Sequence, residues 1–397
     1  MIQYETAQQL LLQQAKPFAT ATIALEDALG RILAETIVAD RDYPPFNRAT
    51  MDGFAFNHTD VSNGIAQFQI IDTIFAGSIT NKILQTGDCF KIMTGAAVPA
   101  SANLVIRKED ATVSENFVTI NIAPSKEFQN IAKQGEDIVV AETLVSNGII
   151  CTPAVISVLA ALGKSAVAVK QIPKVCVFTT GNEIVAVDTH PIDAVQIRNS
   201  NQYLLNALLQ QWQIKPSICK HLQDDKAALT AAFTEALSSD IIIINGGVSA
   251  GDTDFVPEVL TSIGVQLLFH KIAIRPGKPL WCGKLPNGGL VFALPGNPFS
   301  CMVTFQLFIK PYLLACFGLP QQAFLQIPLA ATKEKNVGLD EFFPAKLQAS
   351  PLGLLPLNFK TSGDITATLL ADGIALHPSN LNTLEANTVV NYLPFNY

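Results

Sequence analysis

Residues 240–254 read Asp-Ile-Ile-Ile-Ile-Asn-Gly-Gly-Val-Ser-Ala-Gly-Asp-Thr-Asp, an apolar run that breaks into a glycine-rich loop. The four isoleucines Ile241 to Ile244 are too few for an independent helix and predict a strand covered on both faces of a parallel sheet. Glycines let backbone N–H groups approach an anion closely, while Asp252 and Asp254 suit a hard cation such as Mg²⁺. The loop residues that we expect to contact a ligand are Gly246, Gly247, Ser249 and Gly251. A glycine loop after a strand is more often only a turn, and that alternative stays open at this point.

A second segment, residues 270–279, adds positive charge with the sequence His-Lys-Ile-Ala-Ile-Arg-Pro-Gly-Lys-Pro. If it is a strand, Lys271 and Arg275 share one face, because side chains alternate along a strand with a period of two. An oxyanion could then bind over both cations, with Lys278 following closely. The alternative is a solvated basic face, which an isolated Lys-x-x-x-Arg pattern usually indicates.

A third segment, residues 294–300, reads Leu-Pro-Gly-Asn-Pro-Phe-Ser and opens an apolar helix that we expect to run from Pro298 to Phe317. Asn297 is a favourable N-cap with proline at the first helical position, and the free N–H groups of a helix N-terminus bind anions. Three such segments close together favour a functional site over three unrelated turns. The residues that we expect to contact the ligand here are Pro295, Gly296, Asn297, Pro298 and Ser300.

The strings GGVSAGDTD, IAIRPGKP and LPGNP resemble, in order and spacing, those of the molybdopterin molybdenumtransferases, the MoeA family, which includes the C-terminal domain of eukaryotic gephyrin. The resemblance continues upstream in PPFNRATMDGFA at 44–55, MTGA at 93–96, GEDI at 135–138 and TTGNE at 179–183. It therefore covers nearly the whole chain. Several ordered motifs are more specific than any single glycine pattern.

The resemblance implies an enzyme that inserts molybdate into adenylylated molybdopterin, with Mg²⁺ as the metal and release of AMP. Molybdate is a small tetrahedral dianion, for which Lys271, Arg275 and Lys278 are suitable donors. The implied metal ligands, which would neutralise the departing phosphate through Mg²⁺, are Glu183, Asp252 and Asp254. The implied catalytic residues are Asp52, Thr94, Asp137, Glu183, Asp224, Asp254, Lys271 and Arg275.

Two residues depart from the family's pattern. Asn182 stands where many relatives have aspartate, which removes a possible metal ligand. Arg275 stands where many have lysine, and its planar guanidinium imposes a different geometry on a bound oxyanion. Two alternatives stay open: a non-catalytic scaffold that keeps the pterin pocket, and the related molybdopterin adenylyltransferase. The second is disfavoured, because the regions around Asp52 and Asp137 belong to the longer protein.

The spacing of apolar residues predicts an α/β pattern from residue 174 onward. Strands are expected at 175–178, 217–221 and 240–244, and helices at 201–212 and 224–237. Upstream, helices are expected at 6–16, 25–34 and 152–162, a strand at 165–169, and mainly short strands at 61–140. In an open parallel sheet the ligand lies beyond the carboxyl ends of the strands, where TTGNE, the glycine loop and LPGNP fall.

The resemblance further implies a multidomain α/β plus β fold in four parts. A three-layer α/β molybdopterin-binding domain spans 173–320 and a C-terminal β-barrel domain spans 321–397. A mainly β domain at 43–140 is inserted into an elongated, discontinuous helical and linker domain of residues 1–42 and 141–172. The family also implies a homodimer with sites shared between subunits, and the adenylyltransferase and molybdoenzyme apoproteins as further partners.

Composition excludes several other classes. The chain of 397 residues is 49% hydrophobic and 15% charged, which indicates a globular protein of several domains. Its net charge of −7 argues against broad nucleic-acid or membrane binding, which requires an extended basic face. No run of about 20 uninterrupted apolar residues and no signal peptide are recognised, so a cytoplasmic location is expected. Seven scattered cysteines without a CxxC pair indicate reduced, buried side chains.

Overall fold

The computed structural model describes residues 1–124, 126–248, 254–350 and 352–395. It divides into two compact units. The first contains Met1–Ala34, Gly148–Thr152 and Ala166–Tyr397, and the second contains Glu35–Asn147 and Pro153–Ser165. Both units contain helices and strands, so the fold is multidomain and of mixed α/β content, as expected.

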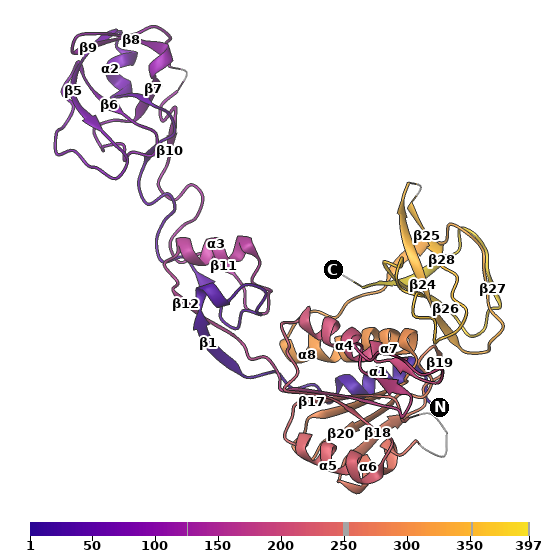
Figure 1. Ribbon diagram of the computed structural model, residues 1–397. Coiled ribbons are helices and arrows are strands. Elements are labelled where there is room, and N and C mark those ends of the chain that lie inside the picture. The colour runs from indigo at the N-terminus through magenta and orange to yellow at the C-terminus, as the bar shows by residue number, and fades with distance from the viewer. Residues whose placement is uncertain (125, 249–253, 351, 396–397) are drawn as a thin grey trace. The chain divides into compact units, whose positions relative to one another are not determined.

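A six-stranded sheet organises the first unit (Figure 1). In spatial order its strands are β16 (Ile218–Leu222), β13 (Val175–Thr180), β17 (Ile241–Asn245), β21 (Leu290–Leu294), β20 (Trp281–Lys284) and β18 (Gln266–His270). The first four are mutually parallel, which confirms the strand predicted from the isoleucine run. The sheet is not parallel throughout, because β20, which was not among the expected strands, runs antiparallel to both β21 and β18.

Alternate residues of β17 belong to two separate hydrophobic cores. Ile241 and Ile243 pack on one face of the sheet, and Ile242 and Ile244 pack on the other. All four side chains are fully buried. The same alternation holds along β13 and β21, so the sheet is covered on both faces, which is why its central strands are apolar throughout.

Helices supply the two covering layers. One face carries α1 (Tyr4–Leu12), α4 (Ser200–Gln210), α7 (Pro298–Thr304) and α8 (Lys310–Phe317), and the other carries α5 (Lys226–Ala236) and α6 (Val256–Ser262) (Figure 1). The helix predicted at 201–212 is confirmed as α4, and its Leu205, Leu208 and Leu209 are buried in the first core. Each helix thus buries one apolar face against the sheet.

The helix from Pro298 to Phe317 is continuous but changes pitch. Its centre, Phe305–Ile309, is a π-helical turn, which accommodates Pro311 because proline cannot donate to the carbonyl one turn earlier. This is the one described helix that has the length and mean hydropathy of a membrane span, but its apolar residues are interrupted by Gln306 and Lys310, and 94% of its apolar window is buried inside the protein. It is therefore a core helix.

A second sheet forms the C-terminal part of the first unit. Its strands are β19 (Ile274–Arg275), β24 (Asp340–Ala349), β26 (Gly373–His377), β28 (Val389–Pro394) and β22 (Leu325–Pro328), with β25 (Leu352–Pro356) paired to β24. An isolated bridge joins Leu329, just after β22, to Leu354 of β25. β19 comes from the middle of the chain and pairs in parallel with β24.

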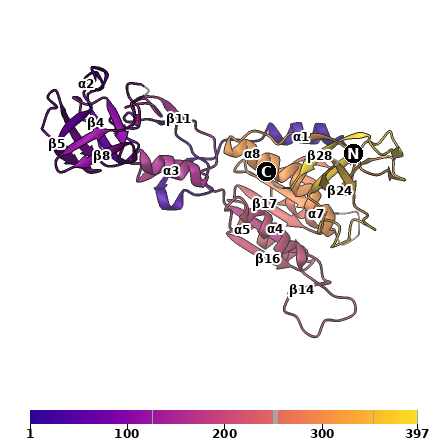
Figure 2. The ribbon, with the colours of Figure 1, turned by 90° about the horizontal axis from the view of Figure 1, so that it is seen from above.

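The remaining elements of the first unit are short. They are β1 (Thr20–Ala24) paired with β12 (Ala166–Lys170), β14 (Ile184–Val185) with β15 (Ile197–Arg198), and β23 (Lys333–Glu334) with β27 (Thr383–Leu384). The loop between β14 and β15 projects from this unit (Figure 2). The helix expected at 25–34 is wrong: a 3-10 turn at Leu25–Asp27 ends before Gly30, whose φ of +75° stops a helix.

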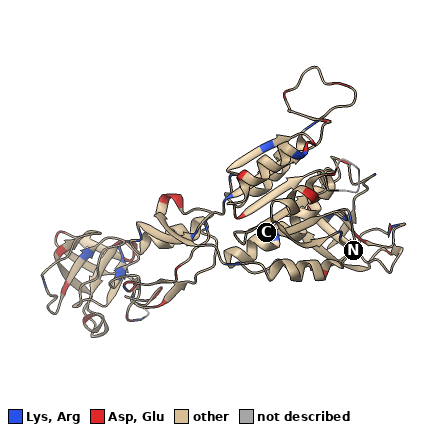
Figure 3. Ribbon diagram, turned by 90° about the horizontal axis from the view of Figure 1, so that it is seen from below, with Lys and Arg blue, Asp and Glu red and all other residues tan. Residues whose placement is uncertain are grey.

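The second unit contains a mixed sheet in the order β7 (Leu104–Arg107), β4 (Gly53–Phe56), β6 (Asp88–Ile92), β5 (Gln67–Ile74), β9 (Phe117–Ile120) and β8 (Ala111–Ser114). This confirms the mainly β character predicted for 61–140. Also present are α2 (His58–Ser62), α3 (Pro153–Ala161), β2 (Ile37–Val38), β3 (Arg48–Ala49), β10 (Ile131–Ala132) and β11 (Thr143–Val145). Basic and acidic residues are interspersed along the described chain (Figure 3).

Candidate functional site

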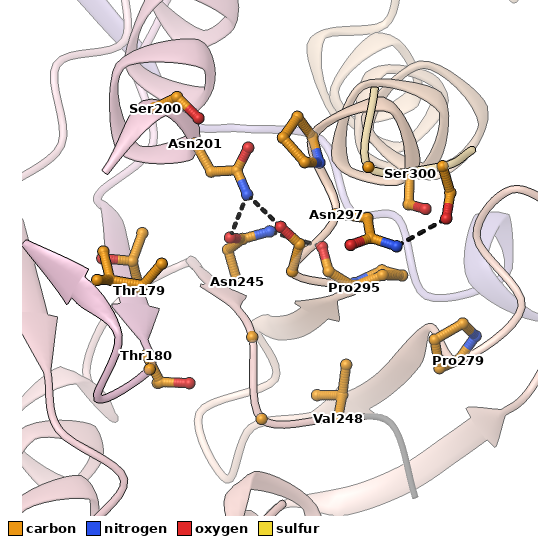
Figure 4. Close-up of a pocket in the computed structure, with 18 of the residues that line it drawn as sticks. Thr179, Thr180, Ser200, Asn201, Asn245, Val248, Pro279, Pro295, Asn297 and Ser300 are labelled. Carbon is orange, nitrogen blue, oxygen red and sulfur yellow. Dashed lines mark hydrogen bonds between the residues drawn. The ribbon is translucent and has the colours of Figure 1, made fainter. Parts of the chain in front are cut away.

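A cavity of about 1110 Å³ lies at the carboxyl ends of β13, β17 and β21 in the first unit. Its walls include Thr180 at the end of β13 and Gly181 after it, Gly246 to Val248 after β17, and Pro295 to Asn297 after β21 (Figure 4). The three segments expected to converge therefore do so. This is the edge at which open α/β sheets bind their ligands.

The first two glycines of the loop are required by their surroundings. Gly246 has a φ of +103°, and a Cβ there would lie 2.7 Å from the backbone oxygen of Thr180. Gly247 has a φ of +66°, and a Cβ would lie 2.7 Å from a methyl group of Val256. Both conformations are strained for residues with a side chain, so the backbone of β17 turns into the cavity only with glycine. Ser249, Gly251 and Asp252 lie outside the described residues.

Two buried asparagines join the loops that follow β17 and β21. Asn245 Nδ2 donates to the carbonyl of Pro295 at 2.7 Å, and Asn201 Nδ2 donates to Asn245 Oδ1 at 2.8 Å and to the carbonyl of Gly296 at 2.6 Å (Figure 4). Since the carbonyls can only accept, they fix the orientation of both amides. The network links α4 to the loops after β17 and β21 and fixes the positions of Asn245, Pro295 and Gly296 in the cavity wall.

Three carboxylates from different elements face the cavity: Glu183, Asp224 and Asp254. The pKa of Asp224 is raised, chiefly by burial and further by the negative charges of Glu183 and Asp254, against the lowering effect of hydrogen bonds from Thr180 and Asn182. Crowded carboxylates of this kind favour either a bound proton or a cation.

Asn182 contributes to this arrangement. Its Oδ1 accepts the backbone N–H of Asp224 at 3.1 Å. The departure from the family's aspartate therefore keeps the hydrogen-bond acceptor that holds the start of the segment before α5, although an amide is a weaker metal ligand than a carboxylate.

The donor set is compatible with Mg²⁺ in kind, because carboxylate oxygens are the ligands that this ion prefers. Within the described ranges, no group of three or more His, Cys, Asp or Glu side chains is close enough together to hold a metal ion by itself. Mg²⁺ commonly keeps several waters and shares its remaining positions with substrate phosphates, so one or two of these carboxylates suffice. The candidates are Glu183, Asp224 and Asp254.

Positive charge enters the cavity wall from Arg198, Arg275 and Lys278. The expectation that Lys271 and Arg275 share a strand face is wrong. β18 ends at His270, Lys271 adopts a left-handed φ of +62°, and β19 begins only at Ile274, in the other sheet. A left-handed residue breaks the alternation of side chains, so the two cations are not brought together, and Lys271 is not among the cavity-lining residues.

The start of the α7 helix borders the cavity, as predicted. Asn297 occupies the N-cap position with Pro298 following, but its side chain makes no capping bond to the helix. Instead Asn297 Nδ2 donates to Ser362 Oγ at 2.7 Å, and the N–H of Phe299 donates to the carbonyl of Ser362 at 3.2 Å. The helix start therefore binds a loop of the C-terminal segment.

In the second unit, Asp52 and Thr94 form a pair. Asp52 Oδ1 accepts hydrogen bonds from both the backbone N–H and the hydroxyl of Thr94, each at 2.8 Å. These bonds, with a smaller contribution from Lys108 at 3.9 Å, hold the pKa of Asp52 below its usual value. Asp137 is exposed in a loop anchored by its N–H to the carbonyl of Tyr43 at 3.0 Å. Asp52 is thus held as a carboxylate.

Several lining residues were not predicted from the sequence. Asn199 and Asn201 lie at the start of the α4 helix, and Asn245 is the last residue of β17. A polar residue at the boundary of an apolar helix or strand is the sequence pattern that could have predicted them. Leu339, Ser362, Gly363 and Ile365 belong to the C-terminal segment, and nothing in their sequence predicts that they line this cavity. Their placement depends on how the second sheet packs.

A sheet covered on both faces, with a polar and charged cavity at the carboxyl ends of its central strands, is typical of α/β proteins that bind a small molecule. Comparison with known proteins narrows this class. The MoeA N-terminal region (domain I and II) matches residues 2–163, and the probable molybdopterin binding domain matches residues 176–315.

Full-length relatives agree. The chain is 33% identical over 394 residues to a molybdopterin molybdenumtransferase of Staphylococcus epidermidis, covering 96% of this chain and 93% of that protein. It is 33% identical over 402 residues to the enzyme of the same name from Staphylococcus aureus strain MRSA252, covering 99% and 95%. The crystal structure of the molybdopterin biosynthesis moea protein from Pyrococcus horikosii matches with a TM-score of 0.86 and 30% identity over 100% of both chains. The chain therefore belongs to the molybdopterin molybdenumtransferase (MoeA) family, a family of enzymes of molybdenum cofactor biosynthesis.

Proposed function

We propose that this protein inserts molybdate into adenylylated molybdopterin, with Mg²⁺ present and with release of AMP. One observation carries the proposal: a single cavity at the carboxyl ends of three strands brings together the cations Arg275 and Lys278 and the carboxylates Glu183, Asp224 and Asp254. A phosphorylated pterin needs the first group, and phosphate cleavage with a divalent ion needs the second.

The cations and the backbone would bind the two anions. Arg275 and Lys278 supply charged donors for molybdate, and the loop that begins at Gly246 supplies N–H groups that can approach a phosphate without Cβ obstruction. The start of the α7 helix adds its positive dipole end, while Pro298 has no N–H and the N–H of Phe299 already donates to the carbonyl of Ser362. For Lys271, a role in the reaction is supported only by the sequence resemblance.

The carboxylates would serve the metal. Mg²⁺ bound through Glu183, Asp224 or Asp254 would neutralise charge on the AMP phosphate as it leaves. Around a site that binds anions alone, three carboxylates would weaken binding by like-charge repulsion, so their presence favours a catalyst over a non-catalytic scaffold. Asp252 stays a proposed ligand from its motif.

The test is incubation of the purified protein with adenylylated molybdopterin, Mg²⁺ and molybdate, with AMP measured over time. AMP release that depends on both molybdate and Mg²⁺ is expected. Asp254→Asn keeps the size of the side chain but removes its charge, and it should lower AMP release at least about 100-fold while adenylylated molybdopterin still binds. A wild-type protein that binds the pterin but releases no AMP would instead be a scaffold.

We further propose a homodimer whose sites each combine the cavity of one subunit with the Asp52, Thr94 and Asp137 surface of the other. The carboxylate of Asp52 is held by two hydrogen bonds in the second unit, in a loop far in sequence from the cavity. A carboxylate held in place in this way is a reasonable contributor to a site shared between subunits. The adenylyltransferase and molybdoenzyme apoproteins are proposed as further partners, in the cytoplasm.

The finer divisions of the fold are also proposals. The bridge between Leu329 and Leu354 brings the end of β22, at one edge of the C-terminal sheet, next to β25, which pairs with β24 near the other edge. This contact supports a closed β-barrel for residues 321–397. For the rest of the chain we keep the division into an α/β domain at 173–320, an inserted domain at 43–140 and a discontinuous domain at 1–42 and 141–172.

A further inference from the structure

We propose that Glu341 is the positioning residue for Arg275: it fixes the guanidinium at the wall of the cavity so that an oxyanion meets a prepared donor. This inference rests on the proposed function, in which Arg275 binds molybdate. Glu341 does not line the cavity and would act only through Arg275.

The contact joins an exposed cation to a buried carboxylate. Arg275 Nε lies 3.8 Å from Glu341 Oε1, and the side chain of Arg275 is 40% exposed while that of Glu341 is only 4% exposed. The carboxylate therefore cannot follow a mobile arginine into solvent. Instead it restricts where the guanidinium can lie, and Arg275 has five N–H donors, of which the ion pair engages only the Nε side.

The backbone reinforces the ion pair. β19 and β24 pair in parallel, and the register places Arg275 directly beside Glu341. Side chains at paired positions on neighbouring strands lie on the same face of a sheet, so the two residues are held adjacent independently of their charges. The strand carrying the carboxylate is itself central, because β26 pairs on its other side and places His377 beside Glu341.

Glu341 also neutralises a second cation besides Arg275. Glu341 Oε2 accepts a second ion pair from Lys333 Nζ at 3.0 Å, and Lys333 is only 17% exposed. Nearby Lys335, which is also buried, is held by the carbonyls of Leu339, His377 and Pro378 at 2.7, 3.2 and 2.6 Å. Glu341 is therefore the shared counter-ion of Arg275 and Lys333, while Asp340 supplies a further negative charge near Lys335.

A neutral residue in place of Glu341 would remove this constraint. Arg275 would then be repelled by Lys333 and would sample more rotamers, and oxyanion binding would have to restore the lost order. The expected effect is on affinity for the oxyanion, with little change in the rate at saturation.

The experiment is a double-mutant cycle in the full-length protein, with binding of sodium molybdate and of sodium sulfate measured by calorimetry. Glu341→Gln should weaken molybdate binding about 10-fold in the wild-type background and less than about 2-fold in the Arg275→Ala background, because its effect passes through Arg275. Glu334→Gln, an exposed carboxylate in the neighbouring strand β23, is the matched control and should leave binding unchanged. Steady-state assays should show a raised KM for molybdate with kcat nearly retained.

A second variant guards against misfolding. Glu341→Gln leaves Lys333 without its carboxylate. The double variant Glu341→Gln with Lys333→Gln restores the balance of buried charge and removes the repulsion from Lys333, and it should still bind molybdate more weakly than wild type, because Arg275 remains without its carboxylate. Equal losses from Glu341→Gln with and without Arg275 would overturn the positioning role. If wild type binds sulfate as tightly as molybdate and the coupling between Glu341 and Arg275 persists, the positioning role stands and molybdate as the specific substrate is refuted.

Discussion

At the scale of single residues, the crowded carboxylates carry the most specific chemistry. Asp224 is partly buried near two other negative charges, and its pKa is raised for that reason. A group whose folded pKa is raised stabilises the protein fully only below its unfolded pKa, and this stabilisation is lost as pH rises through the folded pKa. At neutral pH the ionised side chain of Asp224 therefore costs stability in the absence of a cation.

The prediction for Asp224→Asn has two parts. The variant should melt at a higher temperature than wild type at pH 7, and the difference in melting temperature should narrow as the pH falls and Asp224 of the wild type takes up its proton. AMP release should fall. Thermal unfolding with and without Mg²⁺ checks the cause: Mg²⁺ should raise the melting temperature of wild type more than that of the variant. A variant less stable than wild type at pH 7 would contradict the role of charge crowding.

Thr94 provides a second prediction at this scale. Thr94→Val removes the hydroxyl that donates to Asp52 but keeps the backbone N–H, which contributes the larger part of the lowered pKa. The pKa of Asp52 should therefore rise in Thr94→Val but stay below that of an unrestrained aspartate. Carboxyl carbon NMR across pH 2–6 measures it. Thr112→Val, on an exposed strand of the same unit, is the control and should leave Asp52 unchanged.

The candidate residues near the glycine motifs could be predicted from the sequence, because a loop that follows a buried parallel strand lies at the carboxyl edge of the sheet. The C-terminal end of each parallel strand lies at the same edge of the sheet, so Thr180, Gly246 and Pro295 converge without further information. Ser362 and Glu341 could not be predicted in this way. Their positions depend on the packing of a second sheet, and residue types alone do not specify that packing.

At the scale of elements, the same limit applies to the segment after β18. Its alternating cations indicated a strand, but Lys271 adopts a left-handed backbone and Ile274–Arg275 joins the other sheet. The expected helix at 25–34 failed for a related reason, because Ile32 and Leu33 form bridges with distant residues instead of a local helix. Tertiary pairing overrode local periodicity in both places, whereas long apolar patterns such as α4 and the helix from Pro298 were predicted well.

The glycine loop yields a prediction for its element. Gly246→Ala should lower the free energy of unfolding by about 1 to 3 kcal/mol, through backbone strain and the clash with Thr180, and should weaken phosphate binding. Gly264→Ala is the matched control: it has a similar φ of +89° but an ordinary nearest contact of 3.8 Å, so only strain applies. Urea unfolding of both variants separates the two effects. If both variants lose the same free energy of unfolding, the clash with Thr180 is relieved by local adjustment.

His377 in β26 yields an acid-stability prediction. Burial, with the nearby charges of Lys335 and Lys333, lowers the pKa of His377 to about 4, despite the opposing charge of Glu341. A lowered pKa contributes stability above the unfolded value of about 6.5, and that stability is lost as pH falls through the folded value. In wild type, the free energy of unfolding should therefore fall by up to about 3 kcal/mol between pH 6.5 and 4 because of His377, and His377→Leu should remove this fall. Urea unfolding at successive pH values measures it. An unchanged pH profile would contradict this assignment.

At the scale of the whole molecule, the proposed dimer predicts complementation. Asp52→Ala and Asp254→Ala alter different units of one chain, and each variant alone should have little activity. After mixing under conditions that exchange subunits, AMP release should partly return, because heterodimers would contain one site with neither substitution. A mixture of Asp224→Asn with Asp254→Ala, which alter the same cavity, is the control and should stay inactive. Light scattering that shows only monomers would refute the shared site.

The pairing of β19 with β24 also sets an order for assembly on the ribosome. Arg275 is synthesised before the strand that carries Glu341, and the backbone of Ile2 already holds Lys271 and Ala273, which precede Arg275. A nascent chain that ends before β24 could complete the α/β sheet and its glycine loop, but the β19 segment would lack its neighbouring strand and Arg275 its counter-ion. In the proposed function, Arg275 would therefore gain its counter-ion only after the glycine loop has formed, and the lining residues Ser362, Gly363 and Ile365 would follow later in translation.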